Sequence, residues 1–565
     1  MSPRLEIWGG IECSIVSIEN TVRNQLQDTG HAWRREDIAL LARLGLKTVR
    51  YPVLWEMVEA QHGRFDWQWT DERLGDLRDL GISPIAGLVH HGSGPEWTGL
   101  ADPDFAEKLA HYAGNVARRY PWIDKFTPVN EPFATARISG LYGVWEPHKR
   151  DEKACFRITV AECRAIAKAM EAIRRVTPHA KLVQTEDFGR IYSTPELRAQ
   201  ANYENERRWL SLDLLTGRVV PSHPLYGRLL AAGIDPRHLA ELAEAACAPD
   251  IVGMDYYLTS DRMLDDRLDL HPEELVGGNG RQAYVDIAAV RSDQAQEQAG
   301  LTGRIREVWE RYHLPLAITE LHNGCSRDEH LRWLMEGWEA GLAVREEGID
   351  LRAITSWSLF GARDWNSMMT RNEGHYECGA FDARYTPPRP TIVAKAISGL
   401  AKRGYFDHPV LDTAGWWRQE DASPAWARPL VLIGNNRIHD AIAAACGRRR
   451  LVTTVVVKPA QPAELLASHN GWGAIWVEHR NATKRTYSGE GSLRLHCAFA
   501  QGEPLVLDLP LEWQGMIDTF LDLIIDHHTG HLRCLTQAHS IATNAVVEPV
   551  SGAGINAELE FERVA

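Results

Sequence analysis

The sequence predicts an α/β fold in which a (β/α)8 TIM barrel is followed by a smaller Rossmann-like α/β domain. Short apolar runs alternate with helical segments through about the first 400 residues, and there are eight of these runs. They are rich in Val, Ile and Leu without strict alternation, which is typical of parallel strands buried on both faces. Eight such units with right-handed crossovers close into a barrel. A further strand, turn, helix and strand from residue 428 begin the second domain.

The eight strand-like runs extend from "LEIWG" to "AITSWSL". They cover residues 5–9, 47–52, 83–90, 125–130, 181–186, 250–257, 315–320 and 353–359. Helical segments separate them, such as "REDIALLARLGL", in which apolar residues recur at helical spacing before a glycine stop. The long spacings between the fifth and sixth runs, and between the sixth and seventh, predict insertions at these two places.

The length of 565 residues predicts more than one hydrophobic core. We expect a barrel domain at 1–400, a linker at 401–427 and a second domain at 428–565. The linker expectation rests on "DHPVLDTAGWWRQEDASPAWARP", which contains Pro, Asp and Gly and has no clear period.

Charge and composition exclude several classes of protein. The net charge is −14 and no segment carries a dominant basic patch, so nucleic acid is not expected as a partner. No run approaches about 18 apolar residues, so no membrane span is expected. The start shows no secretory signal and the nine cysteines form no CxxC pair, which favours a cytoplasmic protein with reduced thiols. "DHHTGH" at 526–531 lacks partner spacing for metal ligation, and neither a metal nor a cofactor is expected.

The residues at the carboxyl ends of the runs are polar, charged or aromatic. In chain order they are Glu12 just after the first run, Arg50, His90, Asn130 with Glu131, Glu186 with Asp187, Tyr256, Glu320 and Trp357. In a barrel these ends form one face, where active sites lie. Strands that simply end at the surface would end in residues such as Lys, Ser and Asp at random. The observed pattern therefore favours a functional site.

Two of these ends, Glu131 and Glu320, predict the chemistry. They close the fourth and seventh strands, which lie across the barrel mouth from each other. Retaining hydrolysis of a glycosidic bond needs two carboxyl groups roughly 5–5.5 Å apart, one as proton donor and one as nucleophile. We expect Glu131 to be protonated, and Glu320 to be ionised with help from Arg50 and Tyr256. Asn130 is placed to read a sugar 2-hydroxyl.

Six short motifs carry a resemblance to a known family. They are "IWGG", "RYPVLW" with Arg50 and Trp55, "GLVHH" with His90, "TPVNEP", "GMDYY" and "WSL" from Trp357. With these motifs, about the first 400 residues resemble glycoside hydrolase family 1, whose asparagine–tyrosine motif on the sixth strand is met by "GMDYY". The resemblance implies Glu131 as acid/base and Glu320 as nucleophile. It also implies a sugar subsite formed by Asn130, His90, Trp357, Arg50 and Tyr256.

Three departures from the family pattern bear on the substrate. The nucleophile motif reads "ITELHNG", which is two residues longer before its Asn-Gly than the family motif. The family's Q-x-E-G is absent, and we expect Glu12 in "WGGIEC" or His31 to fill that space. "ARDW" places Asp364 and Trp365 where the family reads sugar hydroxyls with Glu and Trp. The resemblance therefore predicts the reaction better than the sugar.

The second domain resembles a shortened dTDP-4-dehydrorhamnose reductase in its opening segment and in "LDLIIDHHTGHLRC". Its phosphate turn, "GNNRIHD", holds a single Gly, although close approach of a pyrophosphate needs small residues. The reductases also use a Tyr with a Lys four residues later, whereas Tyr487 is followed by Gly at that spacing. We expect a degenerate domain without nucleotide or redox activity, which shapes the barrel mouth or mediates homo-oligomer contact.

These observations predict a retaining exo-β-glycosidase that acts on a small-molecule or oligosaccharide β-glycoside without a cofactor. Two alternatives stay open: a bifunctional nucleotide-sugar-processing protein with a dinucleotide-binding C-terminal domain, and a non-catalytic sugar-binding barrel. Glu186 and Asp187 are expected either to touch substrate or to form an ion pair with Arg50 or Arg190. His91 either lines the pocket or packs in the core.

Overall fold

The computed structural model describes residues 4–418 except 20, 293, 296, 297 and 413, and, further on, residues 428–448, 451–457, 461–480, 492–500, 504–509, 517, 520, 521 and 524. The chain divides into two compact units, Met1–Arg418 and Gln419–Ala565, which are described separately. Residues 401–418, expected at the start of the linker, belong to the first unit. The rest of that linker, the "DHHTGH" segment and Tyr487 lie outside the described residues.

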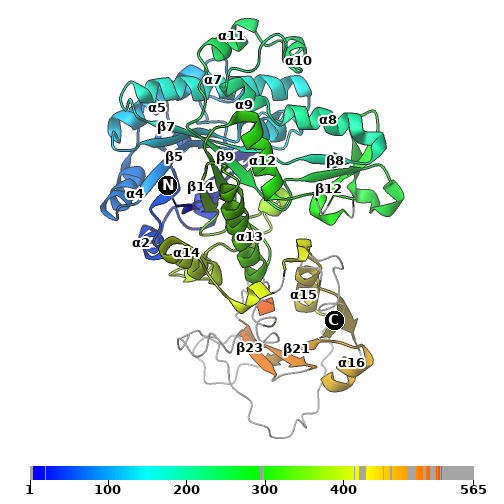
Figure 1. Ribbon diagram of the computed structural model, residues 1–565. Helices are drawn as coiled ribbons and strands as arrows, with labels where there is room; N and C mark the ends of the chain where they lie inside the picture. Colours follow the sequence, from blue (N-terminus) through cyan, green and yellow to red (C-terminus); the bar gives the residue numbers. More distant parts are fainter. Residues whose placement is uncertain are drawn as a thin grey trace. The chain divides into compact units, whose positions relative to one another are not determined.

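Eight parallel strands form a closed barrel in the first unit (Figure 1). The strands are β1 (Glu6–Gly10), β4 (Thr48–Pro52), β5 (Ser83–His90), β6 (Lys125–Asn130), β7 (Lys181–Asp187), β9 (Ile251–Tyr256), β13 (Leu316–Leu321) and β14 (Leu351–Ser356). Each strand neighbours the next in this order, and β14 closes on β1. Every one of the eight apolar runs overlaps one of these strands, so the predicted barrel is confirmed.

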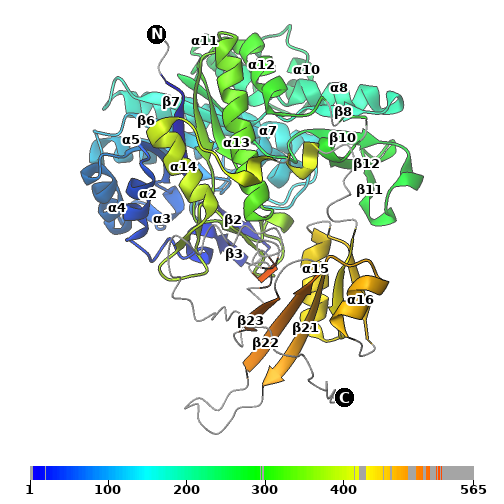
Figure 2. The ribbon, with the colours of Figure 1, turned by 60° about the horizontal axis from the view of Figure 1, so that its bottom comes forward.

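Helices surround the barrel and connect its strands (Figures 1 and 2). Those outside the two insertions include α2 (Asp37–Leu44), α4 (Gln68–Asp79), α5 (Phe105–Arg119), α7 (Glu152–Arg174), α12 (Leu301–Tyr312), α13 (Arg327–Glu346) and α14 (Ile392–Arg403). The side chains of Asp151 and Ser326 accept backbone N–H groups in the first turns of α7 and α13, which starts these helices. Gly45 ends α2 in the left-handed conformation, with φ 83°, which costs glycine no strain.

Shorter elements complete the first unit. They are β2 (Ile15–Ile18), β3 (Thr21–Asn24), α1 (Gln25–Asp28), α3 (Trp55–Val58), α6 (Pro132–Ala136), β15 (Ala362–Arg363), β16 (Tyr376–Glu377), β17 (Phe381–Asp382) and β18 (Arg389–Pro390). Several of them directly follow barrel strands, so they contribute to the end of the barrel at which the strands finish.

Side chains on the barrel strands alternate between two layers. Trp8 belongs to a small apolar cluster inside the barrel. On β9, Met254 and Tyr256 belong to the large core shared with the surrounding helices. Because successive residues of a strand point to opposite sides, Asp255 and Tyr257 face the barrel axis instead. The alternation thus decides which residues at a strand end can enter the site.

Two insertions interrupt the β/α alternation where the long spacings predict them. The first, between β7 and β9, holds β8 (Ile191–Ser193), α8 (Arg198–Arg207), α9 (Leu210–Leu215), α10 (Tyr226–Ala231) and α11 (Pro236–Glu244). The second, between β9 and α12, holds β10 (Arg262–Asp265), β11 (Val276–Gly278) and β12 (Ala283–Ala288). Strands of both insertions join into one sheet with the order β11, β12, β10, β8.

The chain after α14 returns to pack on α13. Trp417 is fully buried, and its ring lies edge-on to Trp333 with 5.4 Å between the centroids. Its indole N–H donates to Glu336 at 2.7 Å, and Arg418 forms an ion pair with the same carboxylate at 2.7 Å. This segment therefore contributes to the core of the first unit.

The second unit is an α/β structure with a mixed sheet. Its elements are β19 (Leu430–Ile433), α15 (Arg437–Arg448), β20 (Thr453–Val456), α16 (Pro462–Ser468), β21 (Gly473–Arg480), β22 (Ser492–Phe499) and β23 (Leu505–Leu509). In the strand order β20, β19, β21, β22, β23, the first three strands are parallel and the last two pair antiparallel. The predicted strand, turn, helix and strand are present. The antiparallel strands depart from a doubly wound parallel sheet, so α/β is the class shown here.

In the turn after β19, side chains of the chain itself bind or cover the backbone at the start of α15. The side-chain oxygen of Asn436 accepts the N–H groups of Ile438 and His439 at 3.1 and 3.3 Å. The His439 ring lies over Gly434, 2.6 Å from the position of an added Cβ. A bound pyrophosphate needs free helix N–H groups and an open backbone at this turn.

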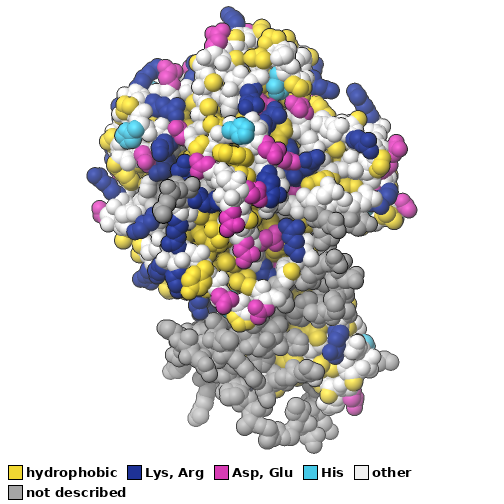
Figure 3. Space-filling view, in the orientation of Figure 1, with side chains coloured by type: hydrophobic (Ala, Val, Ile, Leu, Met, Phe, Trp, Pro, Cys, Tyr) yellow, Lys and Arg dark blue, Asp and Glu magenta, His cyan; other side chains and the backbone are white. Residues whose placement is uncertain are grey.

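The described helices include none that is long and apolar enough to cross a membrane. Figure 3 shows basic and acidic side chains interspersed on one face of the first unit. The surface charge seen there is therefore mixed in sign.

Candidate active site

Three carboxyl groups meet at the carboxyl ends of the barrel strands. Glu131 follows β6, Asp255 lies near the end of β9, and Glu320 lies near the end of β13. One oxygen from each group lies within 4.8 Å of one oxygen from both others. The three residues are buried: Glu131 is 7% exposed, Glu320 is 3% exposed and Asp255 is fully enclosed. Sequence reasoning brought the two glutamates together and missed Asp255.

A bulge in β13 turns Glu320 into this cluster. Against β9, Ile318 pairs with Met254 and Glu320 pairs with Asp255, so Thr319 is an extra residue in the strand. Strict alternation would instead turn Glu320 outward together with Ile318, which packs in the helix layer. Thr319 faces inward as well, and its hydroxyl donates to Asp255 Oδ1 at 2.6 Å.

The guanidinium of Arg50 joins the two halves of the site. Its Nη1 donates to Glu320 Oε1 at 2.8 Å, and its Nη2 donates to Asn130 Oδ1 at 2.5 Å. The group lies over the Trp357 ring, 4.4 Å from the centroid. Asp255 Oδ1 is 3.6 Å from Nη1, so this cation serves two carboxylates. The expected contact of Arg50 with Glu320 is present.

Glu131 occupies a sharp backbone bend between β6 and α6. Its φ of 43° lies in the left-handed region, which residues other than glycine adopt at a cost. The carboxylate of Glu186, from β7, accepts the N–H groups of Phe133 and Ala134 at 2.8 and 3.1 Å and so caps α6. This cap fixes the direction in which Glu131 leaves the strand. Glu186 thus binds the backbone rather than an arginine.

Asn130 is held by neutral neighbours as well as by Arg50. The Thr185 hydroxyl donates to Asn130 Oδ1 at 2.8 Å, and Asn130 Nδ2 lies 3.3 Å from His91 Nε2. The same His91 nitrogen is 3.5 Å from Glu131 Oε2. Burial lowers the pKa of His91 to about 3, so its ring is neutral. His91 therefore lines the carboxyl cluster without adding charge to it.

Burial and charge separate the protonation of the two glutamates. Burial, followed by the charges of Asp255 and Glu320, raises the pKa of Glu131 well above its usual range. Burial and Asp255 also raise the pKa of Glu320, but there Arg50 and a hydrogen bond from Tyr257 act in the opposite direction. Among the described residues, no cation forms an ion pair with Glu131 and the neighbouring His91 is neutral, so Glu131 loses its proton after Glu320.

The hydroxyl that reaches Glu320 belongs to Tyr257 and not to Tyr256. Tyr257 donates a hydrogen bond to Glu320 Oε2. The Tyr256 hydroxyl donates to Asp261 at 3.0 Å, and its ring packs on Trp333 in the helix layer. The expectation for Tyr256 is therefore corrected by one residue. The available signal was alternation, since residues two apart on a strand share a face.

Glu12 occupies the position expected for it after β1. Trp357 Nε1 donates to Glu12 Oε2 at 3.2 Å, while the N–H and hydroxyl of Ser14 donate to Oε1 at 3.0 and 2.6 Å. Burial raises the pKa of Glu12. His31, the other candidate for this space, hydrogen-bonds Asp37 at 2.9 Å and is fully buried. Of the two, Glu12 is the residue in contact with the site.

Aromatic rings stand beside the carboxyl cluster. His90 stacks on Trp357 with 5.4 Å between centroids, and its buried Nε2 has no hydrogen-bond partner among the described residues. Trp365 lies edge-on to His91 and to Trp145, at 5.7 and 5.9 Å. Rings of this kind stack on the C–H faces of sugars, and an open ring nitrogen can bind a hydroxyl.

Asp364 is engaged within the protein. Its Oδ2 accepts from Arg23 Nη2 at 2.9 Å, and its Oδ1 accepts from the N–H groups of His375 and Glu373 at 2.8 and 3.2 Å. The side chain is 1% exposed. The expected contact of Asp364 with a sugar hydroxyl therefore does not match the structure. It ties the loop after β15 to the segment that follows β1.

The longer loop after Glu320 packs inward. The His322 ring is buried beside His330 of α13, with 4.6 Å between centroids, and lies 3.6 Å from the carboxylate of Glu377 in β16. Asn323 is also buried and donates to the backbone oxygen of Glu329 at 3.5 Å. The added residues thus fill the space between β13, α13 and β16.

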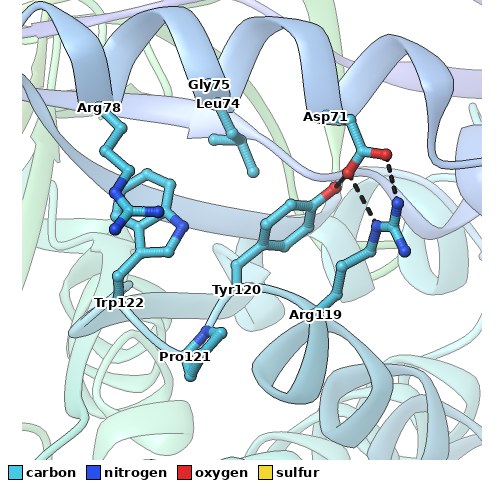
Figure 4. Close-up of a pocket in the computed structure, with 8 residues that line it drawn as sticks. All are labelled: Asp71, Leu74, Gly75, Arg78, Arg119, Tyr120, Pro121 and Trp122. Atoms are coloured by element: carbon cyan, nitrogen blue, oxygen red, sulfur yellow. Dashed lines mark hydrogen bonds and ion pairs between the residues drawn. The ribbon is translucent and has the colours of Figure 1, made fainter.

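A surface depression elsewhere on the barrel is lined by Asp71, Arg119, Tyr120 and Trp122 (Figure 4). Asp71 is held there by Arg119 and by the Tyr120 hydroxyl at 2.8 Å. The residues come from α4 and from the end of α5, just before β5 and β6 begin. The depression therefore lies at the opposite end of the barrel from the carboxyl cluster.

Among the described residues, one further group could approach a metal: Glu206, Asp213 and His223. Asp213 is already bound by Arg311 Nη2 at 2.5 Å and by the Tyr312 hydroxyl at 2.8 Å. These partners make the group an ion-pair network rather than a metal site.

Comparison with known proteins agrees with this geometry. A family model described as glycosyl hydrolase family 1 matches residues 17–376, which is more than half of the chain. The chain belongs to glycosyl hydrolase family 1. It is therefore a glycoside hydrolase, and the retaining β-glycosidase predicted from the sequence is confirmed at the level of this family.

Relatives of this family 1 barrel include proteins with two kinds of named activity. Aryl-phospho-beta-D-glucosidase BglC of Bacillus subtilis is 24% identical over 370 residues, covering 59% of this chain and 77% of that protein. Beta-glucosidase A of Thermotoga maritima is 27% identical over 169 residues, covering 27% of this chain and 36% of that protein.

Solved structures of the family share the barrel fold. The beta-glucosidase from Thermotoga maritima in complex with deoxynojirimycin has a TM-score of 0.58 and 18% identity, covering 72% of this chain and 99% of that chain. This likeness shows the fold of the first unit. The matches give no support to a reductase-like second unit, so that resemblance is not shown.

Proposed function

We propose that Glu320 and Glu131 carry out double-displacement hydrolysis of a β-glycoside. Glu320 attacks the anomeric carbon while Glu131 gives its proton to the departing oxygen. Glu131 then takes a proton from water, which releases the sugar with retained configuration. The observation that carries this proposal is the close approach of the two groups, since one oxygen of Glu131 lies within 4.8 Å of one oxygen of Glu320. An inverting enzyme would hold them roughly 6.5–9.5 Å apart.

The neighbours of each glutamate support these roles. Arg50 and Tyr257 both contact the Glu320 carboxylate, which favours its ionised, nucleophilic form. Glu131 is buried without a cation, which favours its protonated form. Asn130 has its oxygen bound by Arg50, so its amide N–H2 is the end that is oriented by its neighbours for a sugar 2-hydroxyl.

The charge of the site favours a glycoside without a phosphate. Glu12, Glu131, Asp255 and Glu320 bring four carboxyl groups together, and Arg50 is already bound to Glu320 and Asn130. Arg50 is the cation that contacts this cluster in the part of the chain that the structure describes, so a sugar phosphate would add negative charge there without a further counter-ion. We therefore infer that an aryl β-glycoside is a better substrate than the corresponding aryl 6-phospho-β-glycoside. The name of one relative, beta-glucosidase A, agrees with this inference.

A panel of 4-nitrophenyl β-glycosides tests this function. Each sugar, with and without 6-phosphate, is assayed with wild type, Glu320→Gln and Glu131→Gln. Wild type is expected to hydrolyse at least one unphosphorylated member, and Glu320→Gln to lose roughly 10³-fold or more of kcat. Glu131→Gln is expected to lose about 10²–10⁴-fold, and least with the best leaving group.

Two results would contradict the proposal. If wild type and Glu320→Gln hydrolysed the whole panel equally slowly, the barrel would be a sugar-binding protein and not an enzyme. If only 6-phosphoglycosides were cleaved, the charge argument would fail while the two-glutamate mechanism stood.

A Rossmann-like origin of the second unit, contact between copies through it and a cytoplasmic location are further proposals. The parallel order β20, β19, β21 supports the first. The scattered cysteines without CxxC pairs support the last. Sedimentation velocity of the full chain over a range of concentrations tests the contact between copies.

A further inference from the structure

Asp255 has two carboxylate oxygens with unequal partners. Its Oδ1 accepts the Thr319 hydroxyl at 2.6 Å and lies 3.6 Å from Arg50 Nη1. Its Oδ2 is buried, and no donor among the described residues forms a hydrogen bond to it. A buried carboxylate oxygen without a donor is costly, so a proton must reach this position from elsewhere.

Glu131 is the group placed to supply that proton. One oxygen of its carboxyl lies within 4.8 Å of one oxygen of Asp255, and a hydrogen bond between the two groups is among the influences that lower the pKa of Asp255. Two carboxyl groups can share a hydrogen bond only when one of them is protonated. Burial raises the pKa of Asp255 to about 6, against the lowering effects of Arg50, Thr319 and the bond with Glu131. Asp255 is the member of the pair that accepts the Thr319 hydroxyl and lies near Arg50, which favours the charge on Asp255 and the proton on Glu131.

We propose that Asp255 is a positioning residue that shares one proton with Glu131 and so keeps Glu131, the acid of this site, protonated. The family to which the chain belongs carries an asparagine in the sixth-strand motif met here by "GMDYY", and an amide cannot hold this charge. The inference rests on the proposed roles of Glu131 and Glu320.

The pair is enclosed by titratable groups from several strands. They are Arg50 from β4, His91 after β5, Glu186 and Asp187 from β7, Tyr257 after β9 and Glu320 from β13. Arg50 is the cation of this set, and it contacts Glu320 more closely than Asp255. The net charge around the pair is therefore negative, which strengthens its hold on one proton.

The shared proton changes both steps of the reaction. In the first step, the bond from the anomeric carbon to Glu320 forms, the bond to the leaving oxygen breaks, and Glu131 passes its proton to that oxygen. Two adjacent carboxylates, Glu131 and Asp255, then face each other, which makes Glu131 the stronger base. In the second step, water forms its bond to the anomeric carbon, the ester to Glu320 breaks, and the water proton returns to Glu131.

Asp255→Asn tests the charge while keeping the shape. The asparagine Oδ1 can still accept the Thr319 hydroxyl. The basic limb of the kcat/KM pH profile reports deprotonation of the acid in the free enzyme. Without the neighbouring charge the pKa of Glu131 falls, so this limb is expected to move to lower pH by about one unit or more. At pH values above the limb, kcat/KM should then fall about tenfold or more relative to wild type.

Two controls accompany this variant. Asp187→Asn makes the same charge change one strand away, at a carboxylate whose Oδ1 accepts the Gly189 N–H at 2.8 Å, so a smaller shift is expected. With a 2,4-dinitrophenyl glycoside, whose leaving group needs no proton, the difference between wild type and Asp255→Asn should shrink. An unchanged basic limb in Asp255→Asn would show that Asp255 is merely structural and would overturn the proposal.

A melting experiment decides the pairing without any turnover. A buried carboxyl with a raised pKa destabilises the folded protein as pH rises from about 4, its value in the unfolded chain, toward its folded value. Glu131→Gln and Asp255→Asn should therefore each raise Tm relative to wild type at pH 8 more than at pH 5. The double variant should gain less than the sum of the two, because they remove the same interaction.

Two other outcomes would overturn the inference. Additive Tm changes would show that the two carboxyls do not share a proton. If Asp255→Asn instead lost activity only toward an aryl 2-amino-2-deoxy-β-glycoside, with the pH limb unmoved, the charge would serve a cationic sugar. If no aryl glycoside were cleaved by wild type, the proposed function would fail, and the melting comparison would still decide the pairing.

Discussion

The Glu320 carboxylate is held through both of its oxygens by different donors. Arg50 donates to Oε1 at 2.8 Å, and the Tyr257 hydroxyl donates to Oε2. Together they fix the orientation of the group and favour its charge, which is what a carboxylate nucleophile requires. Because Arg50 is buried and Tyr257 is half-buried, water competes little for these bonds.

At this scale we predict that Tyr257→Phe lowers kcat by about 10–100-fold. Loss of a hydrogen bond to a charged group costs about 1.5–3 kcal/mol, and here the charge is that of the nucleophile. Steady-state kinetics with an aryl β-glycoside measure the change. Tyr256→Phe is the matched control, because that hydroxyl bonds Asp261 and should alter Tm more than kcat. Equal kinetic losses in both variants would contradict the assignment of Tyr257.

Sequence reasoning found the residues of the site that end barrel strands, such as Glu131, Glu320 and Arg50. A strand end is visible in the sequence because an apolar run stops there. Sequence reasoning failed at Tyr256, because the choice between the adjacent tyrosines depends on which face of the strand points inward. It also failed at Asp364, because its partner Arg23 is 341 positions away and no local pattern reveals that contact.

At the scale of elements, the barrel strands could be predicted from the sequence, but the structure of the two insertions between them could not. All eight runs overlap barrel strands because burial on both faces demands continuous apolar stretches. The insertions were visible only as excess length. In their small sheet β8 pairs with β10, although four α-helices and β9 lie between these two strands in the sequence. Such pairing of distant short strands leaves little trace in the sequence.

The segment 404–418 shows how a turn-rich sequence can still be core. We predict that Trp417→Ala lowers the free energy of unfolding by about 3–5 kcal/mol, because it leaves a cavity beside Trp333 and removes the indole N–H that donates to Glu336. Thermal melting measures the loss. Trp33→Ala, at a ring that is 74% exposed, is the control and should change Tm little. Similar Tm values for Trp417→Ala and wild type would show that this segment packs loosely.

At the scale of the whole molecule, the chain has two units, and the match to glycosyl hydrolase family 1 lies in the first of them. In the barrel, two glutamates lie close together and aromatic rings stand beside them. The second unit has three parallel strands followed by two antiparallel ones, and in its first turn Asn436 accepts backbone N–H groups while the His439 ring lies over Gly434. The pattern of strand, turn, helix and strand from residue 428 predicted the α/β class of this unit but not its antiparallel strands.

We predict that NADH and NADPH at 1 mM leave the Tm of the full chain unchanged. A ligand that binds the folded protein raises its Tm by mass action, and the occupied turn after β19 leaves no site for the pyrophosphate. Differential scanning fluorimetry gives the comparison, with an iminosugar as positive control for the barrel. A dose-dependent rise in Tm with either dinucleotide would revive the bifunctional alternative.

The extra residue in β13 has a consequence for protein engineering. Thr319 and Glu320 both enter the barrel mouth only because β13 departs from regular pairing at that point. A redesign that kept every residue but imposed regular alternation on β13 would rotate the Glu320 carboxylate into the layer of helices. Deleting Thr319 would leave Glu320 facing inward, opposite Asp255, and would remove the hydroxyl that donates to Asp255. Transplanting this site into another barrel therefore means copying the irregularity along with the side chains.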